Sequence, residues 1–146
     1  MSEAANLVAK IRQAFAPRSL GAWPTPLEAA PALAGALGLR ALWLKREDRS
    51  SARYGGNKVR GLEFLLDDVA PGTVCVTVGG TGSTHCLALT VHAAACGARA
   101  VLAQFPQPDT EWGRAVAAAT ERHAAAVFRA GSRAALGLAL WRAWCR

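Results

Sequence analysis

A lysine that follows two glycines is the first candidate for chemistry in this sequence, in the stretch Gly55-Gly56-Asn57-Lys58-Val59-Arg60. Apolar residues recur at helical spacing after it, so we expect Lys58 in the first turn of a helix. The positive end of the helix dipole disfavours a cation at that position and so favours the neutral amine. A neutral amine is a nucleophile that attacks carbonyl carbons.

The glycines beside Lys58 permit close approach of the backbone to a ligand. This arrangement suits Schiff-base formation with an aldehyde cofactor, and pyridoxal phosphate is the foremost candidate. The same residues also fit a glycine turn followed by a solvated lysine, because lysines are ordinary in the first turn of a helix. Both interpretations stay open at this level.

A second candidate is the glycine-rich turn Gly79-Gly80-Thr81-Gly82, which follows the β-branched run 73–78. Ser83 comes next, and we expect it to cap a helix. Free backbone N–H groups at the start of that helix can hold an anion, and the Ser83 and Thr84 hydroxyls add donors. His85 is a candidate proton carrier or hydrogen-bonding wall. A tight turn with a serine cap and a helix-surface histidine explains the same residues.

The hydrophobic pattern predicts strands that alternate with helices along most of the chain. We expect strands at 41–45, 73–78, 99–105 and 124–128, and helices at 3–15, 29–37, 58–69, 84–96, 111–122 and 134–144. This alternation implies an α/β fold with an open, doubly wound, mainly parallel sheet. Ligands bind beyond the carboxyl ends of parallel strands, so 48–58 and 79–83 are both placed to reach one crevice.

Composition narrows the class of protein. The 146 residues, 52% of them hydrophobic, suffice for one domain with a real core but not for two full domains. The net charge is +7, yet the basic residues are spread out, with one local group at 45–53, which argues against nucleic acid and allows a small anionic ligand. No apolar run is long enough for a membrane span, and residues 1–16 lack a signal-like core. Four cysteines without metal-ligand spacing predict reduced thiols of a cytoplasmic protein.

The main competing motif is a dinucleotide fingerprint in Gly80-Thr81-Gly82-Ser83-Thr84-His85. The third glycine of that fingerprint is replaced by His85, and no acidic residue ends the next strand. A nicotinamide dinucleotide-binding module therefore stays a weaker alternative. We expect His92 and His123 to be surface or partly packed residues of alanine-rich helices. Trp141 and Trp144 share one face of the last helix, which favours a partner surface and a homo-oligomer.

Several motifs together resemble the D-cysteine desulfhydrase and 1-aminocyclopropane-1-carboxylate deaminase family, whose members have the tryptophan-synthase-β-like fold type II. The resemblance keeps the order and spacing of the motifs and covers nearly the whole chain. Its segments are Pro24-Thr25-Pro26-Leu27, Leu44-Lys45-Arg46-Glu47-Asp48, Gly55-Gly56-Asn57-Lys58-Val59-Arg60, Leu62-Glu63 and Gly79-Gly80-Thr81-Gly82-Ser83-Thr84-His85.

The resemblance implies a role for each matching residue. Lys58 would form the Schiff base with pyridoxal 5'-phosphate, with Asn57 beside it in the cofactor pocket. Ser83 would contact the substrate carboxylate or take part in proton transfer. Thr84 stands where the family usually has an asparagine bonded to the ring hydroxyl oxygen of the cofactor, and its shorter side chain would contact both the cofactor and the substrate with one hydroxyl. His85 would contact the substrate. A histidine at this position resembles the desulfhydrase branch, since the deaminase branch commonly has glutamine there.

The resemblance also implies that this chain corresponds to the N-terminal portion of longer enzymes. Residues 1–52 would pack on an absent large domain, and residues 53–146 would form the small α/β domain that carries the lysine. The implied activity is that of a lyase or deaminase on a small amino acid. Two alternatives stay open: an inactive truncated remnant, and half of a split enzyme that associates with a separate C-terminal half. Whether this chain alone is an active enzyme is open too.

Overall fold

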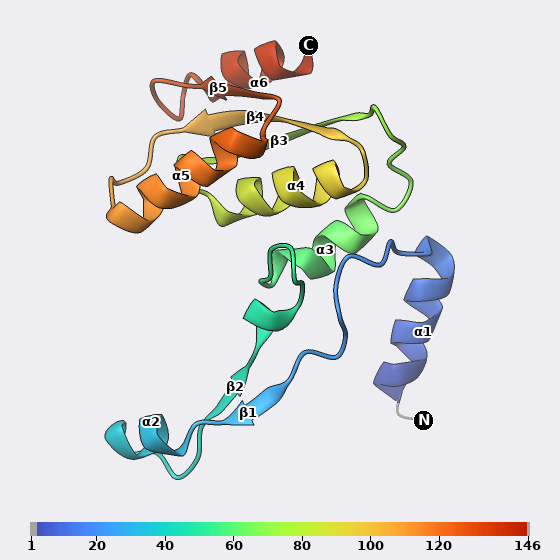
Figure 1. Cartoon of the computed structure of the whole chain (residues 1–146), viewed down its shortest axis with the longest axis vertical. Helices are drawn as coiled ribbons and strands as arrows, with labels where there is room; N and C mark the ends of the chain where they lie inside the picture. Colours follow the sequence, from blue (N-terminus) through green and yellow to red (C-terminus); the bar gives the residue numbers. More distant parts are fainter. Residues whose placement is uncertain (1–2, 146) are drawn as a thin grey trace.

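The computed structural model describes residues 3–145, except the side chain of residue 12, and shows two lobes that meet at helix α3 (Figure 1). Helix α3 spans Lys58–Leu65. The N-terminal lobe contains α1 (Glu3–Phe15), β1 (Leu27–Ala29), α2 (Pro31–Ala36), β2 (Trp43–Lys45) and the short 3₁₀ helix Glu47–Arg49. The sheet lobe contains β3 (Val74–Gly80), α4 (Thr84–Ala95), β4 (Arg99–Phe105), α5 (Glu111–His123), β5 (Ala126–Arg129) and α6 (Leu136–Trp144).

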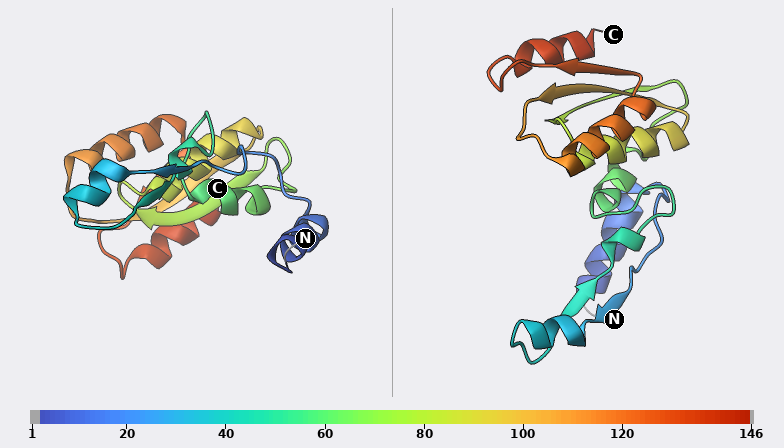
Figure 2. Two further views of the ribbon diagram at one scale, coloured as in Figure 1. Left: turned by 90° about the horizontal axis from the view of Figure 1, so that it is seen from below. Right: turned by 60° about the vertical axis from the view of Figure 1, so that its left-hand side comes forward.

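The sheet lobe is an open, doubly wound α/β structure. Its three strands are parallel and lie in the order β3-β4-β5. Helices α4 and α5 cover one face of the sheet, whereas α6 covers the other (Figures 1 and 2). The predicted fold class is therefore confirmed, and the carboxyl end of β3 leads directly into the turn before α4.

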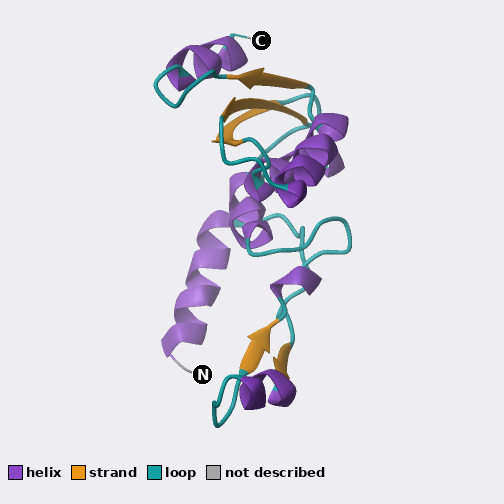
Figure 3. Cartoon of the chain, turned by 90° about the vertical axis from the view of Figure 1, so that its left-hand side faces the viewer, coloured by secondary structure: helices purple, strands orange, loops and turns teal. Residues whose placement is uncertain are grey.

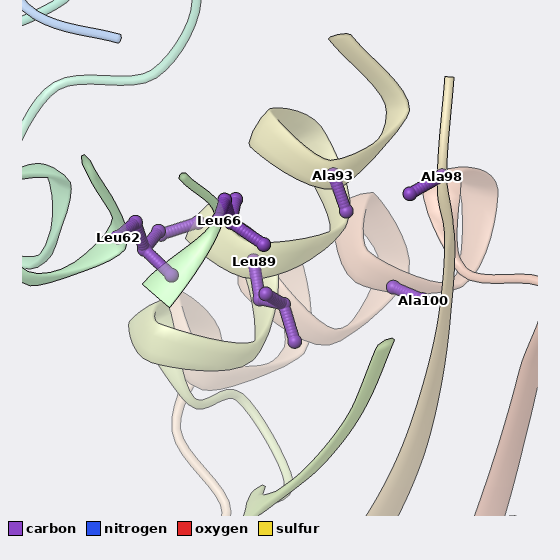
Figure 4. Packing of buried hydrophobic residues seen from close by; sticks show 7 residues of the cluster. Leu62, Leu66, Leu89, Ala93, Ala98 and Ala100 are labelled. Carbon is purple, nitrogen blue, oxygen red and sulfur yellow. The ribbon is translucent and has the colours of Figure 1, made fainter. Parts of the chain in front are cut away.

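A small apolar core fixes α3 against the sheet lobe. Leu62 and Leu66 point towards Leu89 and Ala93 of α4, and alanines at the start of β4 complete the cluster (Figure 4). Alanine side chains let the helix and the strand approach closely, so the leucines fill the space that remains. The position of Lys58, one turn before Leu62, is thereby set relative to α4.

Strand β1 is a feature that the sequence pattern did not predict. It pairs antiparallel with β2, with Glu28 opposite Leu44, and α2 lies between the two strands in the sequence (Figure 3). The helix predicted from residue 29 begins only at Pro31, because proline fits the first helical position. The Ala30 N–H group is bonded to the Leu42 carbonyl instead, at 2.9 Å.

Helix α3 ends earlier than predicted, at Leu65 instead of residue 69. The Arg18 guanidinium donates to the carbonyl oxygens of Leu66, Asp67 and Val69 at 2.7, 3.2 and 2.8 Å. These bonds satisfy carbonyls that another helical turn would have used. Strand β3 in turn continues to Gly80, two residues beyond the predicted end, and both β5 and α6 start two residues late.

Large apolar side chains are exposed in both lobes. In the N-terminal lobe they include Leu7, Val8, Ile11, Phe15, Leu27, Leu33, Leu37, Leu39, Trp43 and Leu44. In the sheet lobe Trp141 and Trp144 of α6 are 62% and 77% exposed. Among the described helices, none is long and apolar enough to span a membrane.

Candidate functional site

Lys58 is the first residue of α3 and its side chain is exposed, so the predicted helix start is confirmed. Asn57 occupies the N-cap position in a helical backbone conformation, and its side chain makes no capping bond. The side-chain amide of Asn57 is therefore not needed to cap the helix, and this side chain is exposed. Both side chains are accessible to a ligand that approaches the start of α3.

The two glycines before Asn57 are required for different physical reasons. A Cβ atom on Gly55 would lie 2.0 Å from the Asp48 carbonyl oxygen, so no side chain fits there. Gly56 has φ +123°, a conformation that other residues rarely adopt, and its N–H group donates to the Glu47 carbonyl at 2.7 Å. The close approach that Gly55 permits is thus an approach to the 3₁₀ helix 47–49.

The Glu47 carboxylate joins the N-terminal lobe to the lysine helix. It accepts bonds from the Arg60 guanidinium at 2.7 and 2.9 Å and from the Thr25 hydroxyl at 2.7 Å. These bonds, those of Arg60 foremost, lower the pKa of Glu47 to about 2. The Arg60 guanidinium also lies 4.0 Å from the centre of the Trp23 ring, a cation–π contact.

The basic group at 45–53 is partly neutralised within the chain. Arg46 is paired with Glu28 and Asp48, and Arg49 is paired with Glu28 as well. Lys45 donates to the Thr25 carbonyl. The anionic ligand that the sequence allowed for this group therefore competes with carboxylates that the two arginines already hold.

The turn after β3 has the predicted form. The Ser83 hydroxyl caps α4 by accepting from the Cys86 N–H group at 3.4 Å. Gly82 has φ +81°, and a Cβ atom there would lie 2.7 Å from the Gly113 carbonyl oxygen. Thr84 and His85 occupy the first two helical positions, where N–H groups have no acceptor within the helix. This end of α4 can therefore donate two amide hydrogens to an anion.

His85, in the first turn of α4, is bonded to β3. Its Nε2 atom is 3.1 Å from the Thr77 hydroxyl of β3, and its ring is half-buried. Burial lowers the pKa of His85 below the usual histidine value, and the positive charge of Lys58 adds a smaller effect in the same direction. The Lys58 side chain therefore contributes to the electrostatic environment of His85.

A cavity of about 310 Å³ lies beside His85 and Thr77, between α3, β3 and α4. Its lining includes Leu62, Leu66, Thr77 and His85, but not Lys58, Ser83 or Thr84. Of the predicted site residues, only His85 lines this apolar hollow, whereas Asn57, Lys58 and Thr84 are exposed at the starts of α3 and α4.

Replacing Lys58 is expected to change the titration of His85. In Lys58→Ala the pKa of His85 should rise towards the usual histidine value without reaching it, because burial remains. The folded chain would then resist protonation of His85 less, so the loss of stability as the pH falls through the usual histidine range should be smaller. The measurement is an NMR titration of the imidazole signals, with Lys45→Ala as the control. An unchanged His85 titration in Lys58→Ala would show that the two side chains do not interact.

Two residues that touch the lysine loop were not identified from the sequence. His92 was expected at the surface or partly packed, but it is fully buried, and its Nε2 atom lies 3.0 Å from the Tyr54 carbonyl oxygen. Its position one turn from Leu89 on the apolar face of α4 was the available signal. Ser50 is also fully buried, but no sequence signal indicated its burial, because it stands in a polar, charged loop.

Comparison with known proteins identifies the class. An α/β sheet with an accessible lysine, and with free backbone N–H groups at the start of the helix that follows a strand, is typical of cofactor-binding folds. Residues 18–137 match the family model described as pyridoxal-phosphate dependent enzyme, and the chain belongs to that family. The match favours pyridoxal phosphate over the nicotinamide dinucleotide of the alternative interpretation.

Individual relatives agree with the resemblance seen in the motifs. A probable 1-aminocyclopropane-1-carboxylate deaminase of Cryptococcus neoformans is 46% identical over 85 residues, which are 56% of this chain and 25% of the relative. A D-cysteine desulfhydrase of Salmonella paratyphi B is 42% identical over 64 residues, 42% of this chain and 19% of the relative. The chain thus spans about a quarter or less of these curated relatives.

A solved structure supports the fold. The crystal structure of an ACC deaminase homologue superposes with a TM-score of 0.68 and 26% sequence identity. The superposition covers 88% of this chain and 40% of the homologue. Both lobes of this chain therefore lie within the matched region for the most part.

Proposed function

We propose that this chain is the N-terminal part of a pyridoxal-phosphate-dependent lyase or deaminase for a small amino acid, of the D-cysteine desulfhydrase or aminocyclopropane-carboxylate deaminase type. The observation that carries this proposal is the exposed Lys58 at the start of α3, within the part of the chain that matches the family model. The family match and the relatives support the reaction class.

The residues at the site fit the proposed cofactor. An aldehyde requires a primary amine, and Lys58 offers one on an accessible surface. Asn57 and Thr84, both exposed, would hold the cofactor from the starts of α3 and α4. When bound, pyridoxal phosphate withdraws electrons from the substrate carbon next to the nitrogen.

The remaining residues would act on the substrate. The N–H groups of Thr84 and His85 lack helical acceptors and suit a carboxylate, with the Ser83 hydroxyl beside them. Burial lowers the pKa of His85 and so favours its neutral ring, which would orient the substrate by hydrogen bonding. Thr77 fixes the direction of that ring through Nε2.

The N-terminal lobe would contact protein that lies outside this chain. Its exposed apolar residues on α1, β1 and β2 would be covered by the large domain of a complete enzyme, or by a separately encoded C-terminal half. The exposed Trp141 and Trp144 would serve a further contact between copies. An inactive remnant would keep the same surfaces without a partner.

Covalent capture of the cofactor tests the proposal. The purified chain is mixed with pyridoxal phosphate, and the expected result is a violet-range absorbance band that borohydride removes while fixing the label on Lys58. Mass spectrometry locates the label. Lys58→Ala should lose both the band and the label, and Lys45→Ala should keep them. Identical spectra from wild type and Lys58→Ala would refute the cofactor site.

A further inference from the structure

Ser50 makes an unusual pair of contacts for a loop serine. Its side chain is 0% exposed, and its hydroxyl donates to the Gly56 carbonyl oxygen and accepts from the Gly56 N–H group, each at 3.0 Å. A hydroxyl can do both at once because it carries one hydrogen and two lone pairs. One buried side chain thus contacts both backbone groups of the residue two positions before Lys58, and it shares the Gly56 N–H group with the Glu47 carbonyl oxygen, which lies at 2.7 Å.

His92 holds the same loop from another element. It lies in α4, is 0% exposed, and places Nε2 3.0 Å from the Tyr54 carbonyl oxygen. Because a carbonyl only accepts, Nε2 carries the hydrogen and donates it. The loop 54–57 is therefore bonded to α4 at one end and to the 3₁₀ helix region at the other.

These contacts continue directly into the lysine helix. The Gly56 carbonyl that Ser50 holds also accepts from the Val59 N–H group at 3.3 Å, which closes the turn around Lys58. The Ser50 carbonyl in turn accepts from the Ala22 N–H group at 2.8 Å. The backbone before Lys58 is therefore held by α4 and by the 3₁₀ helix region, and the Ala22 N–H group in turn holds Ser50.

We propose that Ser50 and His92 are positioning residues that set the place and direction of the Lys58 amine for attack on the cofactor aldehyde. The inference depends on the proposed function for what Lys58 attacks. Neither residue needs to touch the cofactor. Attack on a carbonyl carbon requires the reacting atoms in near-contact geometry, so a small shift of the backbone at Lys58 has a large kinetic effect.

The first test compares Ser50→Ala with the neighbouring Ser51→Ala, whose hydroxyl only accepts from the Arg53 N–H group at 3.4 Å. Each protein is treated with pyridoxal phosphate and borohydride, and mass spectrometry gives the labelling rate at Lys58 relative to Lys45. We expect Ser50→Ala to lower this ratio about tenfold and Ser51→Ala to leave it unchanged. A wild-type ratio in Ser50→Ala would overturn the role of Ser50.

The second test keeps the proposal falsifiable if Ser50→Ala fails to fold. Glutamine can place its amide nitrogen near the Nε2 position of histidine and donate to Tyr54, whereas leucine cannot donate. We expect His92→Gln to retain most of the labelling ratio and His92→Leu to lose it. Equal ratios in the two variants would overturn the role of His92.

Hydrogen exchange separates the two proposals. If wild type gives no label at Lys58, the proposed function fails. Amide exchange over residues 54–59 then still shows whether Ser50 and His92 hold the backbone at Lys58 in place. Faster exchange confined to that segment in Ser50→Ala and His92→Leu would support the positioning role. Wild-type exchange rates there would refute it.

Discussion

Gly55→Ala is expected to destabilise the folded chain by about 3 kcal/mol or more and to disrupt the loop that carries Lys58. The new Cβ atom would lie 2.0 Å from the Asp48 carbonyl oxygen and 2.7 Å from its carbonyl carbon. Both are backbone atoms, so no side-chain rotation relieves the overlap. The loop must separate from the 3₁₀ helix 47–49, and the Gly56 bond to Glu47 is lost with it.

Gly61→Ala is the matched control for this prediction. Gly61 lies inside α3, three residues beyond Lys58, and a Cβ atom there would have no heavy atom within 4 Å. Alanine in an exposed helix interior should stabilise the chain by about 0.5–1 kcal/mol. Urea denaturation measures both variants. Equal stability of Gly55→Ala and Gly61→Ala would contradict the packing of the loop described above.

The sequence predicted those parts of the site that depend on local signals. Ser83 was identified as a helix cap because serine after a glycine turn supplies the acceptor that a helix start lacks, and its bond to the Cys86 N–H group confirms it. The start of α3 at Lys58 was likewise visible in the spacing of apolar residues. Caps and periodicity involve neighbours only a few positions away.

The sequence did not predict features that depend on distant contacts. The burial of Ser50 depends on residues 21–22 and 56, and that of His92 on a carbonyl 38 positions earlier. Strand β1 forms because β2 offers it a partner, with α2 between them in the sequence. A short polar or proline-rich segment carries no local mark of such pairing.

The burial of Glu63 also depends on distant contacts. After Gly55→Ala, a substitution of Glu63 has the next largest expected effect on stability. Glu63 stands among the apolar residues of α3, yet its side chain is only 3% exposed. Its Oε1 atom accepts from the N–H groups of Leu20 and Gly21, each at 3.1 Å. One carboxylate oxygen of α3 therefore holds the segment between α1 and β1 of the N-terminal lobe.

Glu63→Ala is expected to destabilise the chain by about 2–4 kcal/mol, because two part-buried amides lose their acceptor. Helix propensity cannot explain such a loss, since alanine is the better helix former. Glu63→Gln separates the acceptor from the charge. Both bonds end on Oε1, and the single carbonyl oxygen of glutamine can accept both, so we expect a loss of about 1 kcal/mol or less. Urea denaturation gives both values. If the two variants were equally destabilised, the charge of Glu63 and not its Oε1 acceptor atom would hold residues 20–21.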